Sequence, residues 1–299
     1  METLINELND KKVGKVLVDE PLKKYTTIKI GGPADLLIKP SSIDGLIEAI
    51  KLLKKHQMPI RIIGRGSNLL IPDEGIRGAV IQLGKGMDHI EIDNDQIKVG
   101  AGYPLVRLAA IMGREGLSGL EFYGGIPGSI GGAVYMNAGA HGSDTSKILV
   151  KAHILFEDGT TAWLTNEEMK FSYRHSILHG EKKGYVLEAI LQLDKKDKKE
   201  ILAEMKKHKE YRRVTQPWDA PCCGSVFKNP LPRHSGQLVE ELGLKGHAIG
   251  GAKISELHGN FIVNENDASY DDVIALINLV KTEVKKNYNI DLVTEVEIV

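Results

Sequence analysis

Cysteine and net charge are both scarce in this sequence. Only two cysteines occur among 299 residues, and they are the adjacent pair Cys222 and Cys223. Neighbouring cysteines rarely bridge, and two cysteines make no disulfide framework, so we expect a reducing compartment. The formal net charge at pH 7 is −1. We therefore expect no nucleic-acid partner, because nucleic-acid binding usually needs a basic surface.

Segments typical of export or membrane insertion are also lacking. Residues 1–15 mix Glu, Asp and Lys with scattered Leu and Ile, and contain no apolar core of a signal peptide. Residues 122–143 carry no formal charge, and the run is long enough to suggest a membrane-spanning segment. They contain seven glycines, a proline, two serines and an asparagine, however, and no continuous aliphatic face. We expect a cytoplasmic protein with no membrane insertion.

The common nucleotide-binding and hydrolase fingerprints are missing as well. After Gly64 and Gly66, the third glycine of G-x-G-x-x-G is replaced by Leu69. Neither the P-loop pattern nor the nucleophile elbow G-x-S-x-G occurs anywhere in the chain. These absences disfavour a Rossmann enzyme, a P-loop NTPase and an α/β-hydrolase.

Two glycine-rich stretches are present instead. Five of the eleven residues from Tyr123 to Ala133 are glycine, and one is proline. Each glycine costs about 1 kcal/mol of helix stability relative to alanine, so we expect no stable helix there. Successive exposed N–H groups can form a nest for phosphates, although a plain surface turn has the same composition. A second turn at 64–70 follows an apolar run, and the pair suggests two backbone clamps on one extended dinucleotide.

The remaining pattern predicts an α+β fold with many short strands and few helices. Helices are predicted at 1–10, 41–56 (capped by Ser41 or Ser42), 104–115, 236–242 and 270–287, and the lysine-rich segment 194–209 is predicted to be a linker leading into a helix. Strands are predicted on both sides of the turn at 31–33, within 25–40, and at 60–63, 80–83, 89–92, 97–99, 148–156, 161–164, 185–193, 260–263, 290–293 and 296–299.

Isolated polar residues carry little information by themselves. A lone arginine such as Arg174 is usually a surface charge, and a serine that follows a glycine, such as Ser225, usually belongs to a turn. A glutamate near the C-terminus, such as Glu295, is normally exposed to solvent. His175 and His179 are four residues apart, but Ser176 follows the first histidine where a zinc helix needs glutamate. We therefore expect no metal site.

Six motifs in sequence order together resemble the UDP-N-acetylenolpyruvoylglucosamine reductase (MurB) family, the flavoenzymes of peptidoglycan precursor synthesis. The resemblance spans about residues 22–299, and its motifs are Y-T-T with G-G-P-A-D (25–35), G-R-G-S-N-L-L (64–70), G-G-I-P-G-S-I-G-G (124–132), Y-R-H-S (173–176), G-S-V-F-K-N-P (224–230) and T-E-V-E (294–297).

The resemblance implies an FAD-binding fold of the vanillyl-alcohol oxidase (PCMH) type, followed by an α/β substrate-binding domain. The expected FAD-binding subdomains are residues 1–60 and 61–196, the substrate domain is 197–295, and the strand at 296–299 is a candidate to return to the first subdomain. The implied ligands are non-covalent FAD, NADPH as the reducing substrate and UDP-N-acetylglucosamine enolpyruvate as the acceptor. The implied product is UDP-N-acetylmuramate, and the process is cell-wall biogenesis, with its links to cell shape and cell division.

The resemblance also assigns residues to roles. It implies Ser225 as proton donor, with Arg174 and Glu295 at the other two catalytic positions. Lys228 and Asn229 match positions near the substrate, and Arg213 and Gln216 lie where the family holds the diphosphate. The residues that it implies for FAD binding are Ile63, Gly64, Arg65, Gly66, Ser67, Asn68, Leu69, Tyr123, Gly125, Ile126, Pro127, Gly128, Ser129, Gly132, Ala133, Asn137, Ala138 and Gly142.

The sequence departs from some family members at one place. Leu193 leads directly into the lysine-rich segment, which leaves no room for an inserted loop that carries a substrate-clamping tyrosine. The chain thus resembles the shorter class of the family, and a tyrosine clamp on the diphosphate has no evident counterpart.

Two other functions remain open from the sequence. The first is a flavin oxidase of the same fold that uses oxygen, in which a histidine or cysteine is often tethered to the flavin. His141 and Cys222 are the nearby candidates for such a tether. The second is a nucleotide-binding regulatory module without a yellow chromophore.

Overall fold

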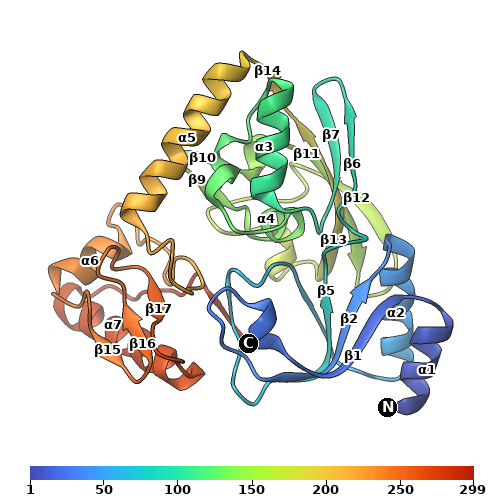
Figure 1. Ribbon diagram of the computed structural model, residues 1–299, viewed down its shortest axis with the longest axis horizontal. Coiled ribbons are helices and arrows are strands. Elements are labelled where there is room, and N and C mark those ends of the chain that lie inside the picture. The colour runs from blue at the N-terminus through green and yellow to red at the C-terminus, as the bar shows by residue number, and fades with distance from the viewer. The chain divides into compact units, whose positions relative to one another are not determined.

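The computed structural model describes residues 1–299, which form two compact units (Figure 1). The first unit comprises residues 1–19, 35–65 and 77–209, and the second comprises residues 20–34, 66–76 and 210–299. Helices and strands are mixed in both units, so the predicted α+β class is confirmed. None of the helices combines the length and the apolar character that crossing a lipid bilayer requires.

The first unit begins with a small sheet beside two helices. The sheet has the order β1-β2-β5-β3, and β3 pairs in parallel with β5. Its strands are β1 (Gly14–Pro21), β2 (Pro33–Pro40), β3 (Ile60–Ile63) and β5 (Ile76–Gln82), and the helices are α1 (Glu2–Asp10) and α2 (Ile43–Lys55). The Ser42 hydroxyl accepts a hydrogen bond from the Gly45 N–H, which confirms the predicted cap of α2.

A five-stranded antiparallel sheet forms the centre of the first unit. Its order is β12-β11-β13-β7-β6, from β6 (Ile90–Asp93), β7 (Gln96–Gly100), β11 (Leu149–Phe156), β12 (Thr161–Thr165) and β13 (Gly184–Gln192). Helix α4 (Ile130–Met136) packs against β13 and β7, while α3 (Leu105–Glu115) packs against the strand β8 (Leu117–Ser118) (Figure 1). The short strands β9 (Gly139–Ala140), β10 (Ser143–Asp144) and β14 (Asp194–Lys195), together with most of α5 (Lys198–Thr215), complete the unit.

The second unit has its own small sheet and its own apolar core. The sheet has the order β15-β16-β17, with β15 (Ala248–Ile249), β16 (Ala252–Ile254) and β17 (Ile262–Asn264), and it packs against α7 (Tyr270–Tyr288), which also contacts α6 (Ser235–Glu241). A reciprocal pair of hydrogen bonds between Ser269 and Asp272 caps α7. The strand β4 (Leu69–Leu70) pairs in parallel with β18 (Glu297–Ile298).

Two predicted strands are wrong. Residues 25–30 do not form a strand, because Lys29 has a left-handed φ of 63° and the Thr26 hydroxyl bonds the Ile30 carbonyl instead of leaving it for a ladder. Residues 290–293 follow Asn289, which ends α7 in the left-handed region, and they run as an irregular segment. In contrast, the strand β1 was not predicted, because its half-exposed pattern shows little alternation.

The expectation that residues 123–133 contain no helix is also wrong, since α4 begins at Ile130 and includes two glycines. Tertiary hydrogen bonds compensate for their low helix propensity: the N–H groups of Ile130 and Gly131 donate to the carbonyls of Tyr103 and Ala101. A Cβ on Gly131 would lie 3.0 Å from the Cβ of Ala101. Glycine therefore allows the close approach on which the short helix depends.

The five-stranded sheet carries one polar cluster that the sequence analysis did not single out. Glu188 on β13 is only 6% exposed, and its carboxylate lies 3.0 Å from His89, 3.2 Å from His153 and 3.3 Å from Lys98. Burial alone would raise the pKa of Glu188, but the hydrogen bonds from these three side chains outweigh it and lower the pKa.

We predict that Glu188→Gln lowers the free energy of unfolding at pH 7 by about 1–3 kcal/mol, because three partners lose their charged acceptor. A carboxylate with a lowered pKa in the folded state stabilises the protein above its unfolded value of 4.5, and this contribution is lost as the pH falls through the folded value. Urea unfolding between pH 3.5 and 7 should thus show a smaller pH dependence for Glu188→Gln than for wild type. The exposed Glu2→Gln is the control, and an unchanged pH dependence in Glu188→Gln would refute the prediction.

Candidate active site

The first glycine-rich turn presents a row of unpaired backbone donors. It follows β3 directly, and the N–H groups of five consecutive residues, from Gly64 to Asn68, donate to no acceptor in the protein. Gly66 has a φ of 62°, and a Cβ on it would collide with the Tyr25 carbonyl. The Gly66 carbonyl in turn accepts a hydrogen bond from the Thr27 N–H. The turn is thus held from outside, while its own donors stay available to an anion.

The second glycine-rich stretch lies beside the first within the first unit. A Cβ on Gly64 would collide with the Ser129 hydroxyl, so the two segments approach as closely as glycine allows. The N–H groups of Ser129 and Gly132 also donate to no acceptor in the protein. The structure therefore brings together the two stretches that the sequence suggested as clamps on one cofactor.

Most of the side chains around this stretch already form contacts within the protein. Tyr123 is fully buried, and its hydroxyl lies 2.7 Å from the Thr145 hydroxyl. Burial raises the pKa of Tyr123, so its hydroxyl stays protonated. Asn137, in the left-handed region, donates to the Ser172 carbonyl and accepts from the Ser146 N–H. Any contact of these residues with a cofactor would therefore be made largely by the backbone.

Arg174 lies in the first unit on a tight turn. Its φ is 53°, and the turn is closed by reciprocal backbone hydrogen bonds between Ser172 and His175. The guanidinium donates to the Gly139 carbonyl at 2.9 Å and lies 5.0 Å from the centre of the Tyr173 ring. Because Gly139 and Asn137 belong to the same short segment, Arg174 is tied to the neighbourhood of α4.

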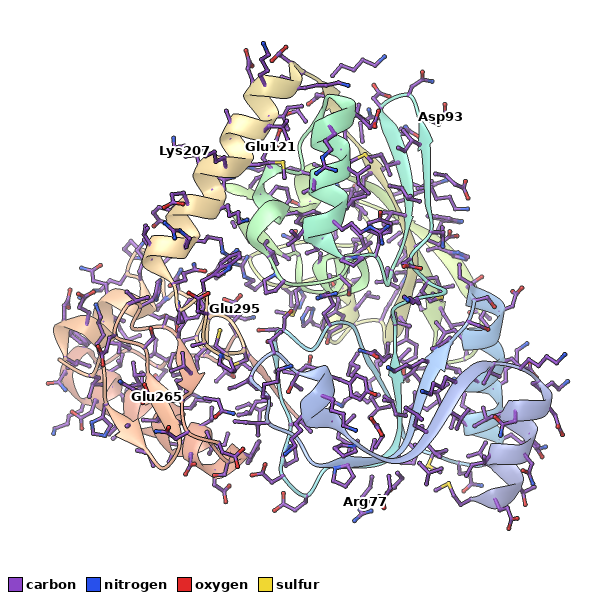
Figure 2. All side chains as sticks on the ribbon, viewed as in Figure 1. Arg77, Asp93, Glu121, Lys207, Glu265 and Glu295 are labelled. Carbon is purple, nitrogen blue, oxygen red and sulfur yellow. The ribbon has the colours of Figure 1, made fainter.

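Ser225 and Glu295 come together in the second unit. The N–H of Glu295 donates to the Val226 carbonyl at 2.8 Å, so the residues on either side of this bond are close neighbours. Asn68 of the first turn also reaches this segment, because its side-chain amide donates to the Glu295 carbonyl at 2.9 Å. Gly224, directly before Ser225, has a φ of 76° and lies against the Ser67 carbonyl. Glu295, labelled in Figure 2, lies two residues before β18.

The four residues predicted to bind substrate also lie in the second unit. The Lys228 carbonyl and the Asn229 side chain both accept hydrogen bonds from Ser235 at the start of α6. Arg213 forms an ion pair with Glu210 at 2.9 Å, and Gln216 accepts a hydrogen bond from the Arg212 side chain. Lys228 and Asn229 are thus held by α6 and lie three and four residues after Ser225. Arg213 and Gln216 lie at the end of α5.

His141 and Cys222, the two candidates for a covalent flavin tether, have the following surroundings. The rings of His141 and His208 stack in parallel with centroids 3.9 Å apart. Burial raises the pKa of the Cys222 thiol, which makes it a poor nucleophile at neutral pH.

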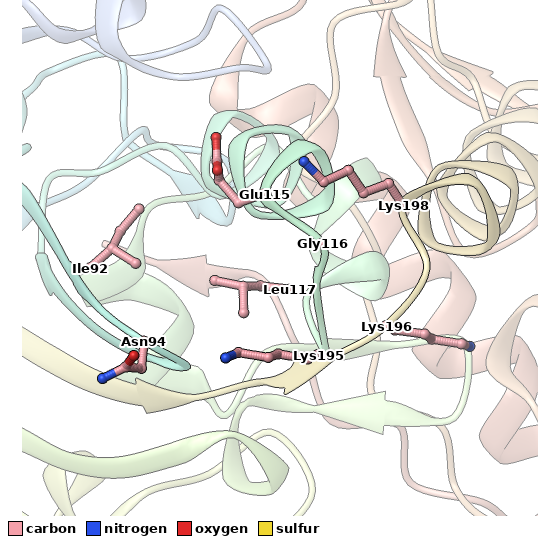
Figure 3. Close-up of a pocket in the computed structure, with 8 residues that line it drawn as sticks. All are labelled: Ile92, Asn94, Glu115, Gly116, Leu117, Lys195, Lys196 and Lys198. Carbon is pink, nitrogen blue, oxygen red and sulfur yellow. The ribbon is translucent and has the colours of Figure 1, made fainter.

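A separate cavity of about 300 Å³ opens at the C-terminal end of α3. Figure 3 shows that Ile92 and Leu117 form its apolar side and that the amine of Lys195 points toward it. The lining residues are Ile92, Asn94, Glu115, Gly116, Leu117, Lys195, Lys196 and Lys198, and none of them belongs to the predicted site.

Comparison with known proteins decides the family. The UDP-N-acetylenolpyruvoylglucosamine reductases of Bacillus velezensis and Bacillus subtilis are each 60% identical over 299 residues, which cover 100% of this chain and 99% of theirs. The chain belongs to the UDP-N-acetylenolpyruvoylglucosamine reductase family. The C-terminal domain profile of UDP-N-acetylenolpyruvoylglucosamine reductase matches residues 216–299, and an FAD binding domain profile matches residues 34–165.

Solved structures agree with this membership. The UDP-N-acetylenolpyruvylglucosamine reductase of Thermus caldophilus superimposes with a TM-score of 0.81 at 36% identity, and the match covers 95% of this chain and 98% of that one. An alkyldihydroxyacetonephosphate synthase matches with a TM-score of 0.51 at 18% identity, covering 65% of this chain and 40% of that one. The second likeness concerns the fold alone, and the predicted FAD-binding fold of the vanillyl-alcohol oxidase type is confirmed.

The residues present fit a dinucleotide such as FAD. Its diphosphate needs several donors, and within the first unit the unpaired N–H groups of Gly64, Arg65, Ser129 and Gly132 provide them without a charged side chain. One residue with a clear link to the site escaped the sequence analysis. Asn260 is 4% exposed and bonds the backbone of Phe227, two residues after Ser225. An asparagine directly before the apolar residues Phe261, Ile262 and Val263 was the only signal for it.

Proposed function

We propose that the protein reduces the enolpyruvyl double bond of UDP-N-acetylglucosamine enolpyruvate to give UDP-N-acetylmuramate, with NADPH as reductant. The observation that carries this proposal is the 60% identity to named reductases over the full length of the chain. It is supported by the paired glycine-rich turns and by the approach of Ser225 and Glu295 to one another.

Non-covalent FAD would be held by the backbone donors of Gly64, Arg65, Ser129 and Gly132, and when bound and reduced it supplies the hydride that no side chain can provide. The chain's own residues then have to stabilise charge and deliver a proton. Hydride addition to the methylene carbon leaves negative charge on the substrate carboxylate, which becomes enolate-like. The carbon that bears the carboxylate must afterwards be protonated.

Arg174 is suited to stabilise that charge. Its guanidinium is planar, binds a carboxylate through two parallel hydrogen bonds and does not deprotonate in proteins. The bond to the Gly139 carbonyl fixes one nitrogen and leaves the group oriented by the backbone. A preorganised donor of this kind stabilises the transition state more than the ground state.

Ser225 is the proposed proton donor. A hydroxyl is a weak acid, so it needs a strongly basic enolate and a cation nearby, for which Lys228 is three residues away. Glu295 lies on the neighbouring segment and would order the site or, if protonated, hydrogen-bond the developing enol. Lys228, Asn229, Arg213 and Gln216 are proposed to bind the sugar nucleotide.

The finer assignments form part of the same proposal. They comprise the preference for NADPH, a cytoplasmic location without nucleic-acid partners, a role in cell shape and cell division, and the FAD contacts of individual residues. The division into FAD-binding subdomains at 1–60 and 61–196 and a substrate domain at 197–295 also stays a prediction.

The visible absorption spectrum of the purified protein tests the proposal first. We expect a yellow protein with the visible absorption of an oxidised flavin, bleached by NADPH without oxygen and restored by the sugar nucleotide. Acid precipitation should release the flavin into solution, since no covalent tether is expected. A colourless protein that still binds nucleotides would favour a regulatory module, and a flavin that precipitates with the chain would favour an oxidase.

A further inference from the structure

Ser225 lies between a glycine in the left-handed region and a segment fixed by hydrogen bonds. Gly224, on its N-terminal side, has a φ of 76°. On its C-terminal side, residues 226–228 are bound along both edges. One edge pairs with residues 293–296, through the bonds from Glu295 N–H to Val226 O and from Lys228 N–H to Val293 O.

Asn260 supplies the other bonds to Val226 and Phe227. Its side-chain oxygen accepts from the Phe227 N–H at 2.9 Å, and its side-chain nitrogen donates to the Phe227 carbonyl at 2.8 Å. A hydrogen-bonded pair in an antiparallel sheet exchanges the same two bonds, so the amide replaces the peptide group of a missing strand. The Asn260 backbone carbonyl adds a third bond, from the Val226 N–H at 2.9 Å.

We propose that Asn260 is the positioning residue for Ser225, and through the same segment for Glu295. The inference rests on the proposed function, because it assumes that Ser225 donates the proton. Asn260 is buried and its side chain bonds only the Phe227 backbone, so it acts on the reaction by fixing residues 226–228. Without its side chain, the segment would keep the bonds to residues 293–296 but lose both bonds to the Phe227 backbone.

The decisive variant is Asn260→Asp, which keeps the size of the side chain. At neutral pH a carboxylate oxygen would face the Phe227 carbonyl and repel it, whereas a protonated carboxyl would restore the donor. We expect oxidation of the reduced flavin by the sugar nucleotide to slow about 10- to 100-fold at pH 7.5, since the repelled Phe227 carbonyl would displace the segment next to Ser225. Relative to wild type at each pH, the rate should recover toward pH 5, and reduction by NADPH should stay normal throughout.

Asn264→Asp is the matched control. The Asn264 side chain also donates to a backbone carbonyl, that of Ile28 at 3.0 Å, and accepts from the Ala268 N–H at 2.8 Å in the same unit. We expect it to lose stability without a selective effect on either half-reaction. A second readout is hydrogen exchange by mass spectrometry, in which the amides of 226–228 should exchange faster in Asn260→Asp only.

The outcomes separate the inference from the function on which it rests. Normal flavin oxidation in Ser225→Ala would overturn the role of Ser225 itself. A defective Ser225→Ala together with an Asn260→Asp that behaves like Asn264→Asp would overturn the inference alone. If Asn260→Asp does not fold at neutral pH, Asn260→Ser replaces it, with an expected loss of about tenfold in the same step and no recovery at low pH; an unimpaired Asn260→Ser would also overturn the inference.

Discussion

Ser225→Ala is expected to leave reduction of the flavin by NADPH unchanged and to slow its oxidation by the sugar nucleotide by about 10²- to 10⁴-fold. This range is the usual contribution of one positioned general acid. The two half-reactions respond differently because only the second one creates a carbanionic carbon that must be protonated. Anaerobic stopped-flow absorbance at the flavin band measures each of them separately.

Ser255→Ala provides the control for this experiment. Ser255 is 5% exposed in the same unit, and its hydroxyl accepts from the Leu257 N–H in a local turn. Its removal should affect stability but neither half-reaction. The solvent isotope effect on the slowed step gives a further readout, because it shows whether water replaces the lost hydroxyl as the proton source. Wild-type oxidation in Ser225→Ala would remove this serine from the mechanism.

Arg174→Lys should be nearly as harmful although it keeps the positive charge. An ammonium group is a compact donor that lacks the planar fork, so it cannot hold both carboxylate oxygens while bonding the Gly139 carbonyl. The loss of one preorganised stabiliser typically costs about 10²- to 10³-fold, and we expect that decrease in the rate of flavin oxidation by the sugar nucleotide. Binding of NADPH and the flavin spectrum should remain close to wild type.

The exposed Arg114→Lys, in the last turn of α3, is the control for charge-preserving replacement. Neither replacement should change the backbone conformation, since lysine tolerates the same φ values as arginine. A turnover rate of Arg174→Lys within twofold of wild type would contradict bidentate recognition of the carboxylate. Recovery of Arg174→Ala by added guanidinium salts would support it.

Elements with strong local signals were predictable from the sequence. Ser42 before an amphipathic run located α2, and the spacing of apolar residues located α7 almost to the residue. The failures occur where distant contacts override propensity. Helix α4 forms because Tyr103 and Ala101 supply acceptors that no local pattern reveals.

The candidate site could likewise be predicted only in part from the sequence. Resemblance of motifs predicted catalytic roles for Ser225, Arg174 and Glu295, which stay predictions, but it did not reveal the contacts that hold these residues. Asn260 is 35 residues from Ser225 in sequence (260 − 225), and its role depends on a pairing across the fold. The second unit likewise recruits Ile28, Ile30 and Leu70 into its core, although they lie far from its other residues in the chain.

The parallel pair of β4 and β18 has a consequence for how the protein acquires its structure. Synthesis from the N-terminus produces Leu69 and Leu70 long before Glu297 and Ile298, their partners in the finished fold. Until then, the strand that follows the first glycine-rich turn is an open edge, and open edges invite pairing with other chains. Contacts of such long sequence separation also slow folding. The first glycine-rich turn is therefore synthesised early, but the strand pair that follows it forms only after Glu297 and Ile298 have been made.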